Sequence, residues 1–215
     1  MAAGRRSPCT PGTATRAEKP TTWPTSTGGC PRRRELADFE EEEVVAEREV
    51  FRGRRLTVVE RDIRIAADRV VTWEVIQKDD SVAIVAIDAE HRVHLVEEYF
   101  GATGERALCL PKGRIDAGET PAEAAGRELR EELGLRGDLG HLCTLSVSPG
   151  YLSQRTEIFL ATALSPDPLE GDEEHSIKPV TLQLDDAVRM CLNGEIHEAR
   201  TVAALLAVAR SHPTP

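Results

Sequence analysis

Three glutamates, Glu128, Glu131 and Glu132, are spaced so that a helix would carry them on one side. Positions i, i+3 and i+4 are neighbours on a helix surface, and like charges at this spacing repel one another. A divalent cation would offset the repulsion, because Mg²⁺ binds oxygen ligands and commonly uses a few carboxylates together with waters and substrate phosphate. The spacing therefore favours a magnesium site. The alternative is a solvated acidic helix face that Arg127 and Arg130 partly neutralise.

The segment around these acids carries the start and stop signals of one helix. Thr120 can cap a helix whose first residue is Pro121, and Glu123 completes a capping box. Gly134 can end the helix in a left-handed cap. Apolar residues recur at helical intervals between these limits and would bury one side: Ala122, Ala125, Leu129 and Leu133.

The stretch from Gly113 to Leu135 reads GRIDAGETPAEAAGRELREELGL. It consists of a glycine, five residues, a glutamate, seven residues, Arg-Glu-Leu-x-Glu-Glu, one residue and Gly-Leu. This spacing resembles the full signature of the Nudix hydrolases, and the likeness extends from about Val44 to about Arg210. The resemblance implies an enzyme that uses Mg²⁺ to split a diphosphate linkage into two monophosphates.

The resemblance also implies a set of metal ligands. Glu128 and Glu132 would be the principal ligands, and Glu131 a further or water-mediated one. The carbonyl of Lys112 would be the main-chain ligand, with Gly113 where the backbone approaches the metal. Mg²⁺ is the expected ion, with Mn²⁺ as a substitute. Such an ion polarises phosphate oxygens and lowers the pKa of an attacking water.

Further catalytic roles follow from the same resemblance. Glu131 would act in the metal site, while Arg127 and Glu119 would form an ion pair that holds the preceding loop against the helix. A general base must reach the attacking water, and related enzymes place a glutamate for this on an acidic loop. Glu173 matches that position best, with Glu174 as the second choice. A solvated acid-rich turn is the alternative for this loop.

Three stretches after the signature resemble the Nudix branch that cleaves ADP-ribose and related ADP compounds: 148–150, 169–174 and 194–201. Two places depart from the ADP-ribose enzymes, because Cys109-Leu110 replaces an acidic residue and Phe100 replaces an arginine. We therefore expect a broader ADP-compound hydrolase acting on ADP-ribose, NADH or diadenosine polyphosphates. A (d)NTP pyrophosphatase and a non-hydrolysing nucleotide sensor are the alternatives.

The residues expected to contact substrate lie in short stretches on both sides of the signature. Aromatic side chains can stack on adenine, and cationic ones can contact phosphate. The expected set is Tyr99, Phe100, Lys112, Pro149, Gly150, Tyr151 and Arg155. Each aromatic residue could instead belong to the core. Phe51 and Trp73 are further stacking candidates from an amino-terminal strand, which in relatives often reaches a partner subunit, so the resemblance implies a homodimer.

Short runs rich in Val and Ile surround the signature and predict strands. The strands are expected at 44–51, 54–60, 70–77, 82–88, 92–99, 141–148 and 156–163, and closing helices at 185–192 and 198–210. Strands, a helix, more strands and then helices indicate an α/β fold with a mixed sheet covered on both faces. This agrees with the α/β/α sandwich that the resemblance implies.

Composition separates residues 1–34 from residues 35–215. The first part has seven Lys or Arg and one Glu, is rich in Pro, Thr, Ser and Gly, and lacks hydrophobic periodicity. It is therefore expected to be a disordered basic leader or the result of a start codon assigned too far upstream, with an organelle transit peptide as the alternative. Residues 35–215 are expected to form one Nudix hydrolase domain.

Charge and cysteine usage limit the expected partners. The net charge is −10 and no apolar run approaches the 18 residues needed for a membrane span, so neither nucleic acid nor membrane is an expected partner. The five cysteines are scattered without a CxxC pair, which predicts reduced thiols in a cytoplasmic protein. The expected partner is a small molecule linked through a nucleoside diphosphate.

Overall fold

The computed structural model of the chain describes residues 42–171 and 177–211, which all belong to one compact unit. The predicted leader at 1–34 and the predicted base Glu173, with its neighbour Glu174, lie outside these residues. In the described part of the chain, no helix is long and apolar enough to cross a membrane.

The first three strands form an antiparallel sheet in the order β1-β2-β3. Its strands are β1 (Glu43–Arg52), β2 (Thr57–Ala66) and β3 (Arg69–Gln77). The expected second strand at 54–60 was wrong in its limits, because Gly53 donates its N–H to the carbonyl of Leu56 in a turn. The charged run that follows the turn is paired with β3 along its length. Pairing with a neighbouring strand therefore outweighs the polar composition of β2.

The second sheet is mixed and seven-stranded, in the order β10-β5-β4-β9-β8, with β6 paired to β5 and β7 to β4. β4 and β9 are parallel, and the other pairs are antiparallel. Its strands are β4 (Ser81–Ile87), β5 (Arg92–Phe100), β6 (Glu105–Cys109), β7 (Lys112–Arg114), β8 (Leu135–Ser146), β9 (Arg155–Pro166) and β10 (Lys178–Gln183).

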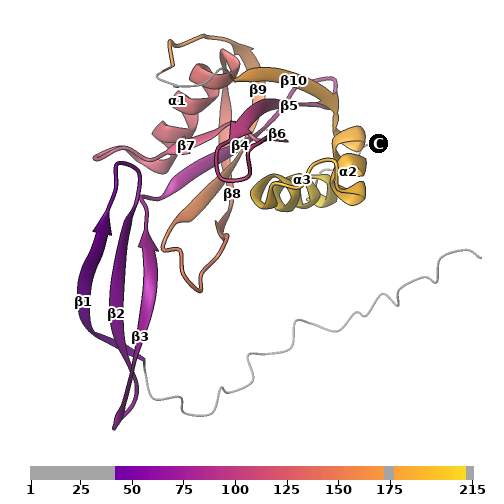
Figure 1. The fold of residues 1–215 in the computed structure, drawn as a ribbon. Coiled ribbons are helices and arrows are strands. Elements are labelled where there is room, and N and C mark those ends of the chain that lie inside the picture. The colour runs from indigo at the N-terminus through magenta and orange to yellow at the C-terminus, as the bar shows by residue number, and fades with distance from the viewer. Residues whose placement is uncertain (1–41, 172–176, 212–215) are drawn as a thin grey trace, which may run out of the picture. The chain divides into compact units, whose positions relative to one another are not determined.

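Strand β4 lies at the centre of this sheet, and all seven of its residues are buried. Because side chains alternate along a strand, Val82, Ile84 and Ala86 pack in one hydrophobic cluster, with α1 (Pro121–Leu133). The intervening residues, Ala83, Val85 and Ile87, pack in a second cluster, with α2 (Leu184–Asn193) and α3 (Ala199–Ser211). The sheet is thus covered by helices on both faces (Figure 1), which confirms the predicted α/β/α sandwich.

Helix α1 begins and ends where the local sequence signals place it. The Thr120 side chain accepts the backbone N–H of Glu123, and the Glu123 carboxylate accepts the N–H of Thr120 in return. Pro121 occupies the first turn. Gly134 ends the helix with φ +68°, and its N–H is donated to the carbonyl of Arg130. These caps satisfy end groups that the helix itself leaves without partners.

Candidate active site

Two of the three signature glutamates lie at a buried position between α1 and the sheet. Glu128 and Glu132 are only 6 % and 7 % exposed. The Glu132 carboxylate accepts the backbone N–H of Lys112 at 3.2 Å, which joins α1 to the start of β7. Burial of a carboxylate is costly without polar or charged partners. The two carboxylates are therefore held between α1 and the start of β7.

Gly113 gives the Glu128 carboxylate its space. β7 pairs with β4, and Gly113 lies opposite Val82 in this pair. A Cβ atom at position 113 would overlap the Glu128 carboxylate group. A side chain at position 113 would therefore force the Glu128 carboxylate out of the volume that it occupies here.

Arg127 connects the acids of the signature. Its Nε and Nη2 atoms each donate to the Glu119 carboxylate at 3.0 Å. Its Nη1 atom lies 2.6 Å from a Glu128 oxygen and 3.0 Å from a Glu131 oxygen. Nη2 also donates to the carbonyl of Arg114 at 2.9 Å, which ties β7 to the helix. One guanidinium group thus holds three carboxylates and the loop before the helix.

The pKa shifts around Arg127 reflect this network. Hydrogen bonds from Arg127, and a backbone hydrogen bond from Asp116, hold the pKa of Glu119 below its ordinary value. The hydrogen bonds to Glu119 and Glu128 raise the pKa of Arg127 despite its partial burial. Arg127 and Glu119 therefore stay ionised together near neutral pH.

Lys112 makes a second charged contact on the adjacent side of the site. Its ammonium group pairs with the Glu98 carboxylate, lies 3.4 Å from Cys109 Sγ and 5.2 Å from the centroid of the Phe100 ring. Burial would lower the pKa of Lys112, but Cys109 and Glu98 outweigh it and the pKa is raised. Burial raises the pKa of the Cys109 thiol to about 12. Glu98 is one of two acids on β5 and was not among the site residues predicted from the sequence.

The donor set suits a hard divalent cation in chemistry, since carboxylate oxygens are the ligands that Mg²⁺ and Mn²⁺ prefer. Within residues 42–171 and 177–211, no three His, Cys, Asp or Glu side chains converge closely enough to hold a metal ion. The Arg127 guanidinium lies between Glu128 and Glu131 instead. A cation held by Glu128 and Glu132 would therefore compete with Arg127 for the Glu128 carboxylate.

The other expected substrate residues lie on three segments. Tyr99 and Phe100 end β5, while Pro149, Gly150 and Tyr151 form the turn between β8 and β9. This turn is fixed to β3, because the Tyr151 carbonyl accepts the N–H of Ile76 at 2.7 Å. Arg155 begins β9, and its backbone N–H is donated to Asp80 at 2.8 Å. Of the expected set, Lys112 and Phe100 are in contact, because the Lys112 ammonium lies over the Phe100 ring.

The first part of the acidic loop is fastened to α1. Asp167 donates its N–H to the carbonyl of Gly134, and Leu169 donates to the carbonyl of Arg130. The Arg130 side chain forms an ion pair with Asp167 at 3.0 Å. A Cβ atom at Gly171 would lie 3.6 Å from the Cβ of Glu131. The segment 167–171 therefore runs beside the signature acids.

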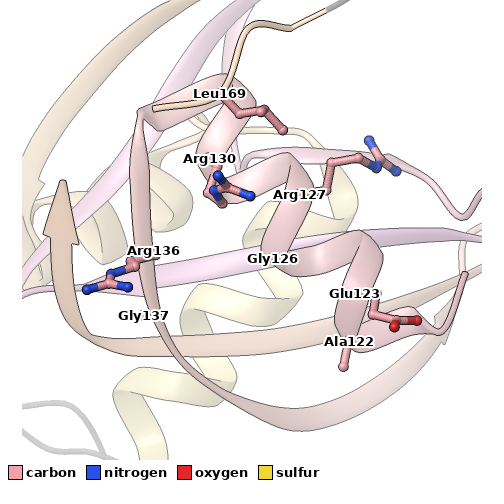
Figure 2. A pocket seen from close by; sticks show the side chains of 8 residues that line it. All are labelled: Ala122, Glu123, Gly126, Arg127, Arg130, Arg136, Gly137 and Leu169. Carbon is pink, nitrogen blue, oxygen red and sulfur yellow. The ribbon is translucent and has the colours of Figure 1, made fainter. Parts of the chain in front are cut away.

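A hollow of about 410 Å³ opens along another side of α1 (Figure 2). Its lining residues are Ala122, Glu123, Gly126, Arg127, Arg130, Arg136, Gly137 and Leu169. Glu128, Glu131 and Glu132 are not among them. Arg127 and Arg136 point in opposite directions in this view. The hollow is therefore not lined by the acids, but it shares Arg127 with the place where they meet β7.

Comparisons with known proteins show the family of the chain. A NUDIX domain model matches residues 77–205. The ADP compounds hydrolase NudE of Escherichia coli is 39 % identical over 130 residues, which cover 60 % of this chain and 69 % of that protein. The ADP-ribose pyrophosphatase of Mycobacterium tuberculosis is 35 % identical over 150 residues, 68 % of this chain and 72 % of that protein.

A solved structure described as an ADP compounds hydrolase superposes with a TM-score of 0.72 at 31 % sequence identity. The match covers 81 % of this chain and 95 % of that one. The sequence, the sandwich fold and the arrangement of α1 against β7 point to the same family, as the signature predicts. The chain belongs to the Nudix hydrolase family.

Proposed function

We propose that this enzyme hydrolyses the diphosphate linkage of ADP compounds in the presence of Mg²⁺. The observation that carries the proposal is the buried pair Glu128 and Glu132, held against the Lys112-Gly113 backbone. Relatives named for ADP compounds and ADP-ribose, which match most of the chain, support the substrate class. The expected products are AMP and a second phosphate compound.

The chain's own residues would divide the work as follows. Glu128 and Glu132 would hold the cation, with Glu131 and the Lys112 carbonyl as further oxygen ligands. Arg127 would orient Glu128 and Glu131 through its present contacts. When bound, the cation would polarise the phosphate oxygens and lower the pKa of the attacking water. The water oxygen bonds to one phosphorus, and the anhydride oxygen leaves with the other phosphate.

We assign the proton from the attacking water to Glu173, with Glu174 as the second choice. The support is the course of residues 167–171, which brings the start of the acidic loop beside Glu131. Glu173→Gln is expected to lower kcat by roughly a hundredfold, as for loss of a general base. Glu174→Gln is the matched control and is expected to stay within a few-fold of wild type. A kcat for Glu173→Gln within a few-fold of wild type would exclude the role.

A (d)NTP pyrophosphatase would need the same metal acids, so the signature alone does not separate the two activities. A substrate panel of ADP-ribose, NADH, diadenosine triphosphate and dNTPs, each with Mg²⁺ and with excess EDTA, separates them. We expect turnover of the ADP compounds that EDTA abolishes. Turnover of dNTPs alone would replace the proposed substrate class.

We also propose a homodimer that acts in the cytoplasm. Large apolar side chains of the β1–β3 sheet are exposed, with Phe51 at 56 % and Trp73 at 47 %, and a second copy of the chain would cover them. Cys109, Cys143 and Cys191 are free thiols, which fits a reducing compartment. Light scattering after gel filtration should give twice the 23.5 kDa chain mass. A mass of one chain would overturn the dimer.

A further inference from the structure

The segment Leu110–Lys112, which leads into Gly113, is held from three directions. The N–H of Leu110 is donated to the hydroxyl of Thr201 at 3.0 Å. The carbonyl of Pro111 accepts the N–H of Ile84 in β4 at 2.9 Å. The N–H of Lys112 is donated to Glu132 in α1 at 3.2 Å. Three consecutive residues therefore connect α3, the central strand and the candidate metal carboxylate.

The contact from α3 is itself supported by a partly buried charge. Thr201 is fully buried, and both its hydroxyl and its backbone N–H are donated to the Glu198 carboxylate, at 2.8 and 2.9 Å. Arg200 donates to the other oxygen of Glu198 at 2.8 Å. Burial would raise the pKa of Glu198, but Arg200 and Thr201 outweigh it and the pKa is lowered. The Thr201 hydroxyl is thus oriented: it donates its O–H to Glu198 and accepts the N–H of Leu110.

We propose that Thr201, oriented by Glu198, is a positioning residue of this hydrolase: it fixes the Leu110–Lys112 backbone and thereby the place of Lys112 and Gly113 against Glu132 and Glu128. The role deepens the proposed function and rests on it. Thr201 acts through Leu110, and its described contacts are with Leu110 and Glu198, not with Glu128 or Glu132.

Local geometry explains why a hydroxyl at this position would affect the site. Leu110 is fully buried, so its N–H has no access to water once Thr201 is changed. Pro111 has a fixed φ, so a displacement of Leu110 is passed along the chain and is not absorbed by free rotation there. Lys112 is the next residue, and its N–H already meets Glu132. Small errors in the position of reacting groups are known to cost large factors in rate.

The test compares Thr201→Val, which has nearly the same shape without the hydroxyl, with Thr201→Ser, which keeps it. Val208→Ala is the matched control, because Val208 is a buried core residue of the same helix that makes none of these hydrogen bonds. Glu198→Gln is a milder second variant that remains informative where Thr201→Val does not fold. Amide hydrogen exchange of residues 108–114 is measured in the full-length protein, together with kcat and KM for ADP-ribose.

We expect Thr201→Val to speed exchange at Leu110 and Lys112 by at least about tenfold, and to lower kcat by about tenfold with KM within about twofold. Thr201→Ser should restore both values, and Glu198→Gln should shift both in the same direction by less. Val208→Ala should lower the melting temperature without changing either. Unchanged exchange, or faster exchange with unchanged kcat, would overturn the positioning role. Failure of wild type to cleave any ADP compound would refute the proposed function, while the exchange measurement would still test the hydrogen-bonded connection.

Discussion

Arginine–glutamate ion pairs occur both around α1 and in the β1–β3 sheet, but in different surroundings. Around α1, one arginine, Arg127, forms ion pairs with the carboxylates of Glu119, Glu128 and Glu131, which are buried or partly buried. In the β1–β3 sheet, arginines and glutamates pair across neighbouring strands in solvent, as Arg48 and Glu60 do. The two regions contain the same types of charged residue, but these side chains are more deeply buried around α1 than in the β1–β3 sheet.

Burial and convergence, more than charge, therefore mark the functional region. An exposed ion pair contributes little free energy because water screens it and its long side chains lose freedom. A buried group of acids loses its hydration and depends on its partners. The acids of α1 therefore need Arg127, Lys112 and Gly113 in place, whereas the sheet pairs can be changed one at a time.

The largest effect should come from filling the space beside Glu128. Gly113→Ala puts a methyl group where the carboxylate lies, so Glu128 must move. We expect kcat for ADP-ribose to fall by about a hundredfold, as for other small displacements of reacting groups. Gly140→Ala on β8 is the control, because its Cβ would meet nothing within 4 Å. Equal kcat values for the two variants would contradict the close approach.

The second largest effect should come from removing the Arg127 guanidinium, which joins the three carboxylates. Arg127→Met leaves the Glu119, Glu128 and Glu131 carboxylates without their shared guanidinium. The free energy of unfolding, measured with urea, should fall by about 2 kcal/mol. Arg130→Met, which breaks a more exposed ion pair on the same helix, should cost clearly less. Equal losses would contradict the expectation that a more buried ion pair contributes more to stability than an exposed one.

A pH effect follows from the lowered pKa of Glu119. Because its folded pKa lies below its ordinary value, its contribution to stability is fully present above about pH 4.5 and is lost as pH falls through the folded value. The difference in unfolding free energy between wild type and Glu119→Gln should therefore be constant from pH 7 to about pH 5, and should shrink in more acidic solution. A difference that grows as pH falls would give the wrong sign.

The smallest effect is expected in the amino-terminal sheet. Arg48→Ala removes an ion pair in which the arginine side chain is 71 % exposed. Unfolding free energy should change by no more than about 0.5 kcal/mol, and turnover of ADP-ribose should be unchanged. A loss comparable to that of Arg127→Met would show that this pair matters as much as those of α1.

Sequence alone predicted the signature helix well, since its caps at Thr120 and Gly134 act within a few residues. It did not predict β6 and β7, which are five and three residues long and exist through their pairing with β5 and β4. It also missed the first half of β8, where Gly137 gives a turn-like composition. The backbone there is close to the Thr162 carbonyl and leaves no space for a side chain.

The candidate site could likewise be predicted only where its residues lie close together in the sequence. The spacing of Glu128, Glu131 and Glu132 was readable because they lie on one helix. The pairing of Lys112 with Glu98 and the contact of Leu110 with Thr201 were not, because they join residues 14 and 91 positions apart. Such contacts depend on how the sheet and α3 are arranged, which no local pattern encodes. The predicted roles of Glu173 and of the substrate residues remain predictions.

Steady-state turnover of ADP-ribose with Mg²⁺ by wild type, Glu132→Gln and Glu123→Gln tests whether the reaction depends on the acids of α1. Glu132 is a buried acid facing β7, and Glu123 is an exposed acid of the same helix whose capping role glutamine can fill. We expect kcat to fall by at least about a hundredfold for Glu132→Gln, and to stay within about twofold of wild type for Glu123→Gln. Wild-type turnover by Glu132→Gln would contradict a hydrolase that acts through the acids of α1.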